Sequence, residues 1–175
     1  MEPIEGPAPS VMARFRGRRN KATELALVRL LRRHQLSGWR RHHRLRLTAR
    51  TVPNTGASVP RYCEPDFVFG KAKVAVMVDG CFWHGCARHC RLPTTNSEYW
   101  VHKIARNQER DVVVAVVLKR NGWRVVRVWE HDLKTPERCV RRITAALEKS
   151  VERRAQAKTK RNNRSPFIAT TSGRA

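Results

Sequence analysis

The fold is decided by residues 65–79, which read Pro65-Asp66-Phe67-Val68-Phe69-Gly70-Lys71-Ala72-Lys73-Val74-Ala75-Val76-Met77-Val78-Asp79. Two short runs of aromatic and β-branched residues flank the turn at Gly70-Lys71, and this pattern predicts a β-hairpin. The open ends of a hairpin lie side by side, so Asp66 and Asp79 are expected to lie close together. Two such carboxylates can share a divalent cation such as Mg²⁺, which prefers oxygen ligands. Polar strand ends that bind no metal are the alternative.

Upstream of the hairpin, apolar residues recur near helical spacing and predict an amphipathic helix over residues 22–38. These residues are Leu25, Val28, Leu31 and Leu36, and Gly38 is expected to end the helix. Glu24 lies in the first turn, where the helix dipole favours an anion. Residues 39–47 predict a basic edge strand, and residues 48–62, which contain proline and glycine, predict a loop.

Downstream of the hairpin, residues 79–95 are rich in cysteine and histidine, and a helix is expected to begin near residue 96. The β-branched run 112–118 favours a strand by propensity. The Lys119, Arg120 and Gly122 that follow are typical of a helix end, so one continuous helix is predicted. Residues 123–129 predict a strand and residues 136–148 a closing helix. The order α-β-β-β-α-β-α predicts an α/β or α+β fold with a mixed sheet.

Charge dominates the composition. The 175 residues include 37 Lys and Arg against 14 Asp and Glu, which gives a formal net charge of +23. A small domain this basic is expected to bind a polyanion. One folded domain is expected at residues 21–150, with basic disordered segments at 1–20 and 151–175. No apolar stretch approaches the roughly 20 residues of a membrane span, and no secretory signal is visible, so a cytoplasmic, nucleoid-associated location is expected.

A metal site is indicated by the run Gly80-Cys81-Phe82-Trp83-His84-Gly85-Cys86-Ala87-Arg88-His89-Cys90. The chain has five cysteines, and an odd number in a reducing compartment argues against a disulfide framework. Soft ligands at this density resemble part of a tetrahedral zinc site. The candidate ligands in this run are Cys81, Cys86, His89 and Cys90, and His131 is the leading candidate for a ligand from elsewhere in the chain. Isolated thiols are the alternative.

Other side chains near these ligands allow more than one role. His84 can act as a general base on water, bind zinc or pack. Phe82 and Trp83, with Trp100 on the next helix, can either wedge into a DNA base step or form a small core over the zinc. Asp111 lies in a strongly charged stretch, whose default role is a solvated helix face.

Four blocks of sequence follow one another along the chain. They are Pro65-Asp66-Phe67-Val68; Val78-Asp79-Gly80-Cys81-Phe82-Trp83-His84-Gly85-Cys86; Asn96-x-x-x-Trp100-x-x-Lys103-Ile104-x-x-Asn107-x-x-Arg110-Asp111; and Gly122-Trp123-Arg124-Val125-x-x-Val128-Trp129-Glu130. Together they resemble the very-short-patch mismatch repair DNA endonucleases, over residues 20–133. The combination is far more specific than any single block.

This resemblance implies a restriction-endonuclease-like mixed β-sheet flanked by helices, with a structural zinc loop. It implies an enzyme that nicks one strand of double-stranded DNA beside the thymine of a T·G mismatch, such as arises when 5-methylcytosine deaminates. Mg²⁺ would serve the chemistry and Zn²⁺ the structure. Mismatch repair factors are the partner proteins that the resemblance suggests, and no membrane is implied.

The resemblance also assigns roles by motif position. Asp66 resembles the central Mg²⁺-binding carboxylate, and Val78 the residue whose backbone carbonyl binds the same metal. His84 resembles the catalytic histidine and Asp111 the acid that orients it. Glu24 resembles an acidic residue near the site on the family's first helix. The aromatics expected to insert beside the mismatch are Phe82, Trp83 and Trp100.

Two departures from the family pattern bear on the site. Asp79 stands where the best-known member has a second histidine, which affects how metal and water are held and adds Asp79 to the catalytic candidates. The spacing of the zinc ligands also differs, and His131 replaces a cysteine. The ligand set most consistent with the family pattern is Cys81, Cys86, His89 and His131, with Cys90 as the substitute for His89.

Two other functions fit the sequence. A sequence-specific restriction-type endonuclease on the same scaffold would cut without a mismatch. A non-catalytic, zinc-stabilised DNA-binding module would bind DNA without Mg²⁺ and leave it intact, although Asp66, His84 and Asp111 together argue against this function.

Overall fold

The computed structural model describes residues 21–48 and 59–162. The predicted N-terminal arm and the last part of the predicted tail lie outside the described residues. In chain order, the elements are α2 (Lys21–Arg33), β1 (Trp39–Arg41), β2 (Leu45–Arg46), β3 (Tyr62–Cys63), β4 (Phe67–Phe69), β5 (Val74–Asp79), α3 (Ser97–Arg120), β6 (Arg124–Trp129), the 3₁₀-helix η1 (Glu130–Lys134) and α4 (Pro136–Asn162).

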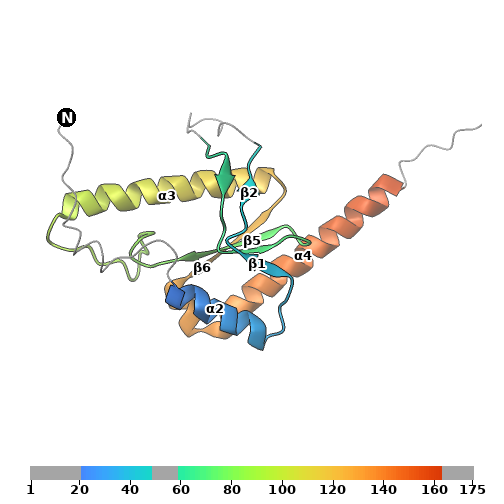
Figure 1. Ribbon diagram of the computed structural model, residues 1–175, viewed down its shortest axis with the longest axis horizontal. Coiled ribbons are helices and arrows are strands. Elements are labelled where there is room, and N and C mark those ends of the chain that lie inside the picture. Colours follow the sequence, from blue (N-terminus) through green and yellow to red (C-terminus); the bar gives the residue numbers. More distant parts are fainter. Residues whose placement is uncertain (1–20, 49–58, 163–175) are drawn as a thin grey trace, which may run out of the picture.

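A four-stranded mixed sheet lies at the centre of the fold (Figure 1). Its strand order is β1-β4-β5-β6; β4 is antiparallel to both β1 and β5, and β6 is parallel to β5. The hairpin pairs Phe67 with Val76 and Phe69 with Val74. The predicted hairpin and the predicted mixed α/β fold are both confirmed.

Helices cover both faces of this sheet, with α3 on one face and α2 and α4 on the other (Figure 1). Alternate strand residues point to opposite faces, so each strand contributes to both cores. The core under α2 and α4 includes Leu27, Leu31, Phe67, Val76, Val128 and Ile143. The core under α3 includes Leu45, Leu47, Val68, Ala75, Val117 and Leu118.

The predicted continuous helix over residues 112–118 is confirmed, because α3 runs unbroken to Arg120. Its valines pack against the sheet and the β2–β3 pair; those in contact are Val113, Val114, Val116 and Val117. The apolar surface buried there offsets the modest helix propensity of β-branched residues.

The first helix and the edge strand differ from their predictions. In α2, Val28 and Leu31 are buried as predicted, but Leu27 and Leu30 are buried as well and Leu25 is 41% exposed, so the buried face is only partly the predicted one. The predicted edge strand is broken at His42, whose φ of 48° is incompatible with extended backbone. As a result β1 joins the main sheet, whereas β2 pairs with β3 in a separate two-stranded sheet.

The last helix is longer than predicted. α4 continues to Asn162, so residues 151–162 are helical rather than disordered. Ser150 is fully buried, residues 151–157 are exposed, and this end of α4 extends away from the sheet (Figure 1). Of the helices within residues 21–48 and 59–162, none has the length and apolar character needed to cross a bilayer.

Candidate active site and Cys/His cluster

The candidate active site lies where the β4–β5 hairpin opens. Asp66 immediately precedes β4, and Val78 and Asp79 end β5. Antiparallel pairing places these ends side by side, and the Val78 backbone N–H donates a hydrogen bond to Asp66 Oδ2 at 2.7 Å. The predicted proximity of the two strand ends is therefore present in the structure.

Asp66 belongs to a group of three residues, which we call the Asp66 cluster: Glu24 from α2, His42 after β1, and Asp66. One ligand atom of each lies within 4.8 Å of the others. Glu24 is 2% exposed, and its Oε2 is 2.8 Å from His42 Nε2 and accepts a hydrogen bond from Arg41. Its other oxygen, Oε1, is buried with no hydrogen-bond partner among the described residues.

The electrostatics of the Asp66 cluster favour a bound cation. Burial raises the pKa of Asp66 to about 6, the hydrogen bond from Val78 opposes this rise, and the charge of Glu24 adds to it. A bare, buried carboxylate oxygen next to a second carboxylate is costly unless a cation compensates it. Hard oxygen donors of this kind suit Mg²⁺, so the residues present fit the metal that the sequence predicted.

A second group lies on the other side of the β5 end, and we call it the Arg127 cluster: Asp79, His84, Asp111 and Arg127. Arg127 Nη2 donates to Asp79 Oδ1 at 2.7 Å and to Asp111 Oδ2 at 2.8 Å, while Arg127 Nε donates to Asp79 Oδ2. His84 Nδ1 hydrogen-bonds to Asp111 Oδ2 and lies 3.7 Å from Asp79 Oδ1.

These contacts fix both charge and orientation. Burial alone would raise the pKa of Asp111, but hydrogen bonds from His84 and Arg127 lower it to about 2. Burial acts to lower the pKa of Arg127, but its hydrogen bonds to Asp79 and Asp111 raise that pKa above its usual value. The guanidinium therefore stays charged. Because Asp111 engages Nδ1 of His84, the Nε2 atom is the one left for proton transfer.

Arg127 changes what was predicted for Asp79. The sequence allowed Asp66 and Asp79 either to share a cation or to be polar strand ends without a metal; in the structure Asp79 is 2% exposed and both of its oxygens accept hydrogen bonds from Arg127. The structure thus assigns the two carboxylates to different clusters. Arg127 was not predicted as a site residue. The signal for it was a charged residue within the otherwise apolar part of β6. Arg127 pairs with Met77 in the β5–β6 register, two residues before Asp79.

One face of α3 positions the loop that carries His84. The contributing residues are Ile104, Asn107, Gln108 and Asp111, which recur at helical spacing. Asn107 donates to the Trp83 carbonyl at 3.0 Å and Gln108 to the His84 carbonyl at 3.2 Å. Gly85, at φ +61°, lies so close that an added Cβ would be 2.5 Å from Gln108 Nε2. The charged stretch around Asp111 is therefore not only a solvated face.

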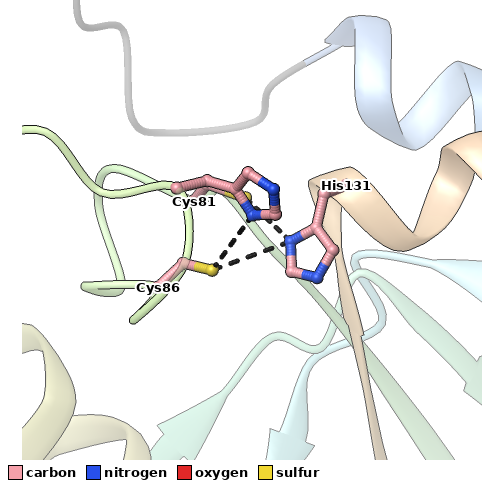
Figure 2. Close-up of side chains that lie close together, drawn as sticks. Cys81, Cys86 and His131 are labelled. Atoms are coloured by element: carbon pink, nitrogen blue, oxygen red, sulfur yellow. Dashed lines mark hydrogen bonds between the residues drawn. The ribbon is translucent and has the colours of Figure 1, made fainter.

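The Cys/His cluster consists of Cys81, Cys86, His89 and His131, each with a ligand atom within 4.8 Å of the others. Cys81 Sγ is 3.1 Å and Cys86 Sγ 3.7 Å from His131 Nδ1, and Figure 2 shows the Cys86 sulfur directed at the His131 ring. Cys86 Sγ is 3.5 Å from His89 Nδ1. His89, and not Cys90, completes the group; the Cys90 thiol lies 3.7 Å from the Phe82 carbonyl.

These separations fit a zinc ion. Ligands about 2.3 Å (sulfur) and 2.0 Å (nitrogen) from a tetrahedral zinc lie about 3.5 Å from one another, which is close to the sulfur–nitrogen distances in the cluster. Burial raises the pKa of the Cys81 thiol to about 11, so a cation is needed to hold the thiolate there. The cluster joins the loop after β5 to η1 after β6.

The three aromatics predicted to insert into DNA pack against one another. Ring centroids lie 5.4 Å apart for Phe82 and Trp83, 5.1 Å for Phe82 and Trp100, and 5.9 Å for Trp83 and Trp100. Trp100 is fully buried, so in this conformation it serves as core and has no face to offer a base step. Phe82 and Trp83 are half-buried, and their insertion stays a prediction.

Comparisons with known proteins find DNA mismatch endonucleases and nicking enzymes among the relatives of this chain. Residues 56–92 match the family described as DNA mismatch endonuclease Vsr. The chain is 58% identical over 69 residues to the type II nicking enzyme V.NaeI of Lentzea aerocolonigenes, a match that covers 39% of this chain and 42% of that protein. It is 40% identical over 85 residues to the DNA mismatch endonuclease Vsr of Escherichia coli K12, covering 47% and 52%.

A third relative is the type II nicking enzyme V.XorIIP of Xanthomonas oryzae pv. oryzae, which is 37% identical over 94 residues, with 52% of this chain and 61% of that protein covered. The chain spans about half the length of the curated relatives it matches.

Proposed function

We propose that this chain is a member of the Vsr DNA mismatch endonuclease family and hydrolyses a phosphodiester bond in one strand of duplex DNA. The observation that carries this proposal is the pair of clusters at the open end of the hairpin. One contains a bare, buried carboxylate oxygen, and the other contains a histidine oriented by an acid. The net charge of +23 supports a polyanionic substrate.

Asp66, Glu24 and the backbone carbonyl of Val78 are the groups we expect to hold Mg²⁺. A divalent cation bound there supplies charge stabilisation for the scissile phosphate. The Val78 N–H holds Asp66 by Oδ2, which leaves Asp66 Oδ1 as the oxygen for a ligand. The burial that raises the pKa of Asp66 also strengthens its attraction to a cation.

His84 is the residue we expect to take a proton from the attacking water, at Nε2. Asp111 fixes the ring by its bond to Nδ1 and stabilises the imidazolium that forms. Arg127 holds Asp111 and Asp79 in place, so it acts as a positioning residue in this proposal. Cys81, Cys86, His89 and His131 would hold a zinc ion that anchors the loop carrying His84.

Two triggers for nicking are candidates. V.NaeI and V.XorIIP are named as type II nicking enzymes without reference to a mismatch, which favours nicking at a specific duplex sequence as the first candidate. The family description and the Escherichia coli relative name a mismatch, which favours a T·G pair as the second. Mismatch repair factors are proposed as partners only with the second. A non-catalytic DNA-binding module would show neither activity.

The test uses duplexes with randomised flanks around one T·G pair, their fully paired twins, and a different label on each strand. We expect Mg²⁺-dependent cleavage of a single strand, absent in Asp66→Asn. Equal cleavage of both duplexes supports sequence-directed nicking, and cleavage of the T·G duplex alone supports the mismatch-directed activity. Binding without cleavage at any Mg²⁺ concentration contradicts the proposal.

A further inference from the structure

The Asp66 cluster contains one residue that no prediction used, His42. It follows β1 in the left-handed region, at φ 48°, and its backbone N–H donates to the Asp66 carbonyl at 3.2 Å. A non-glycine residue adopts this conformation only when its surroundings hold it there. The turn therefore fixes the imidazole beside the two carboxylates, with 21% of the side chain exposed.

An ion pair with Glu24 does not account for the arrangement. Glu24 Oε2 already receives a charged hydrogen bond from Arg41, and His42 Nε2 approaches the same oxygen at 2.8 Å. The other oxygen of Glu24, equally buried, has no partner among the described residues. If His42 served only to neutralise Glu24, we would expect its N–H to donate to the unpaired Glu24 Oε1 and not to Oε2, which already has a partner. The bare oxygen and the imidazole nitrogen together are the donors that a metal ion takes.

We propose that His42 is the third protein ligand of the cation held by Asp66 and Glu24, which makes the site a mixed nitrogen–oxygen site. This inference rests on the proposed function for the presence of a cation and goes beyond it in the ligand set and the metal. Mg²⁺ strongly prefers oxygen, whereas imidazole suits transition metals. The site is therefore suited to Mn²⁺ in preference to Mg²⁺.

The test measures binding of Mn²⁺ alone to the full-length, zinc-loaded chain without DNA. Electron paramagnetic resonance follows the loss of the free Mn²⁺ signal, and electron spin echo modulation detects a ligated ¹⁴N nucleus. The variant is His42→Gln, and the matched control is His43→Gln, since His43 is the next residue, is exposed and lies outside the cluster. Zinc content and circular dichroism verify that each variant folds.

We expect the parent and His43→Gln to show ¹⁴N modulation, and His42→Gln to lose it and bind Mn²⁺ at least about tenfold more weakly. Competition with Mg²⁺ should show that the preference for Mn²⁺ falls in His42→Gln alone. The proposal is overturned if the parent lacks ¹⁴N modulation, or if His42→Gln retains it or binds Mn²⁺ as His43→Gln does. Nicking is assayed separately with Mg²⁺: if it persists while the ¹⁴N result fails, only this inference falls, and if the parent never nicks, the proposed function falls.

Discussion

The Asp66 cluster and the Arg127 cluster each contain two acids and a histidine at the same end of the same hairpin, yet they differ in what balances their charge. In the Arg127 cluster, a guanidinium lies between the two carboxylates and donates to both. In the Asp66 cluster, Arg41 donates to one oxygen of Glu24, and the other oxygen has no hydrogen-bond partner among the described residues. This difference indicates that acids alone do not define a metal site: the carboxylates of the Arg127 cluster are compensated by a guanidinium, and we propose that those of the Asp66 cluster are compensated by a bound cation.

The largest effect of this difference is expected for the substitution Asp66→Asn. If Asp66 binds the metal as proposed, its loss should remove several kcal/mol of transition-state stabilisation, which corresponds to at least about a thousandfold in the nicking rate. DNA affinity should be unchanged, because it depends on basic residues elsewhere. Strand-resolved nicking and a gel-shift titration at one salt concentration measure the two. An equal loss of nicking and of DNA affinity would indicate that Asp66 is needed for the fold and not for binding a metal.

Zinc removal should separate the clusters. The loop that contains Cys81, Cys86 and His89 also carries His84 to the Arg127 cluster, but within the described residues it contributes none to the Asp66 cluster. Chelation, or Cys86→Ser, should abolish nicking and lower the melting temperature while Mn²⁺ binding at Asp66 persists. Elemental analysis of the purified chain should find a single equivalent of zinc. A chain that contains no zinc, and nicks, would remove the Cys/His cluster from the proposal.

Removing Arg127 should make the second cluster resemble the first. In Arg127→Met, the buried Asp79 loses its partner, which should cost about 3 kcal/mol in the free energy of unfolding. The control is Asp79→Asn combined with Arg127→Met, which removes the uncompensated charge and should recover much of that loss. Added Mg²⁺ should stabilise the single variant more than the parent. Denaturant unfolding with and without Mg²⁺ tests both statements, and equal stability of the single and double variants would contradict them.

The two clusters should also respond to pH with opposite sign when no metal is present. The pKa of Asp66 is raised to about 6, so the native state holds the proton more tightly than the unfolded chain, and stability falls as pH rises from about 4 to 6. The pKa of Asp111 is lowered to about 2, so its contribution is present above about 4 and is lost as pH falls toward 2.

Asp66→Asn should therefore remove a fall of about 2 kcal/mol between pH 4 and 6, and Asp111→Asn should flatten the acid limb below pH 4 by a smaller amount, because water screens the partly exposed Asp111. The measurement is the pH dependence of urea unfolding, each variant against the parent. The prediction would be contradicted if the two substitutions changed the pH dependence of the free energy of unfolding in the same direction.

The smallest expected effect concerns Trp83, which directly precedes His84 in the loop after β5. If its ring inserts beside a mispaired base, Trp83→Ala should reduce the ratio of T·G to paired cleavage severalfold while overall DNA binding changes less. Competition cleavage of the two duplexes in one tube gives the ratio directly. An unchanged ratio with a lower melting temperature would assign Trp83 to the aromatic core around Trp100.

Much of the fold could be predicted because its signals are local. The β4–β5 hairpin and the continuous α3 depend on runs of neighbouring residues, and the four members of the Cys/His cluster depend on ligand chemistry within one loop and one later histidine. What could not be predicted depends on register between distant segments. Arg127 reaches Asp79 only because β6 pairs in parallel with β5, and His42 reaches Asp66 only because the edge strand breaks at a left-handed residue.

The outward end of α4 has a consequence for the motions of the molecule. Beyond Ser150, residues 151–157 are exposed, so this part of the helix gains no stability from burial of a face. Isolated helices shorter than about 12 residues are marginal in water. Among the helices, the amides of this part of α4 should therefore exchange hydrogen for deuterium first, in order from Asn162 toward Ser150, with protection rising sharply at the turn that contains Ser150.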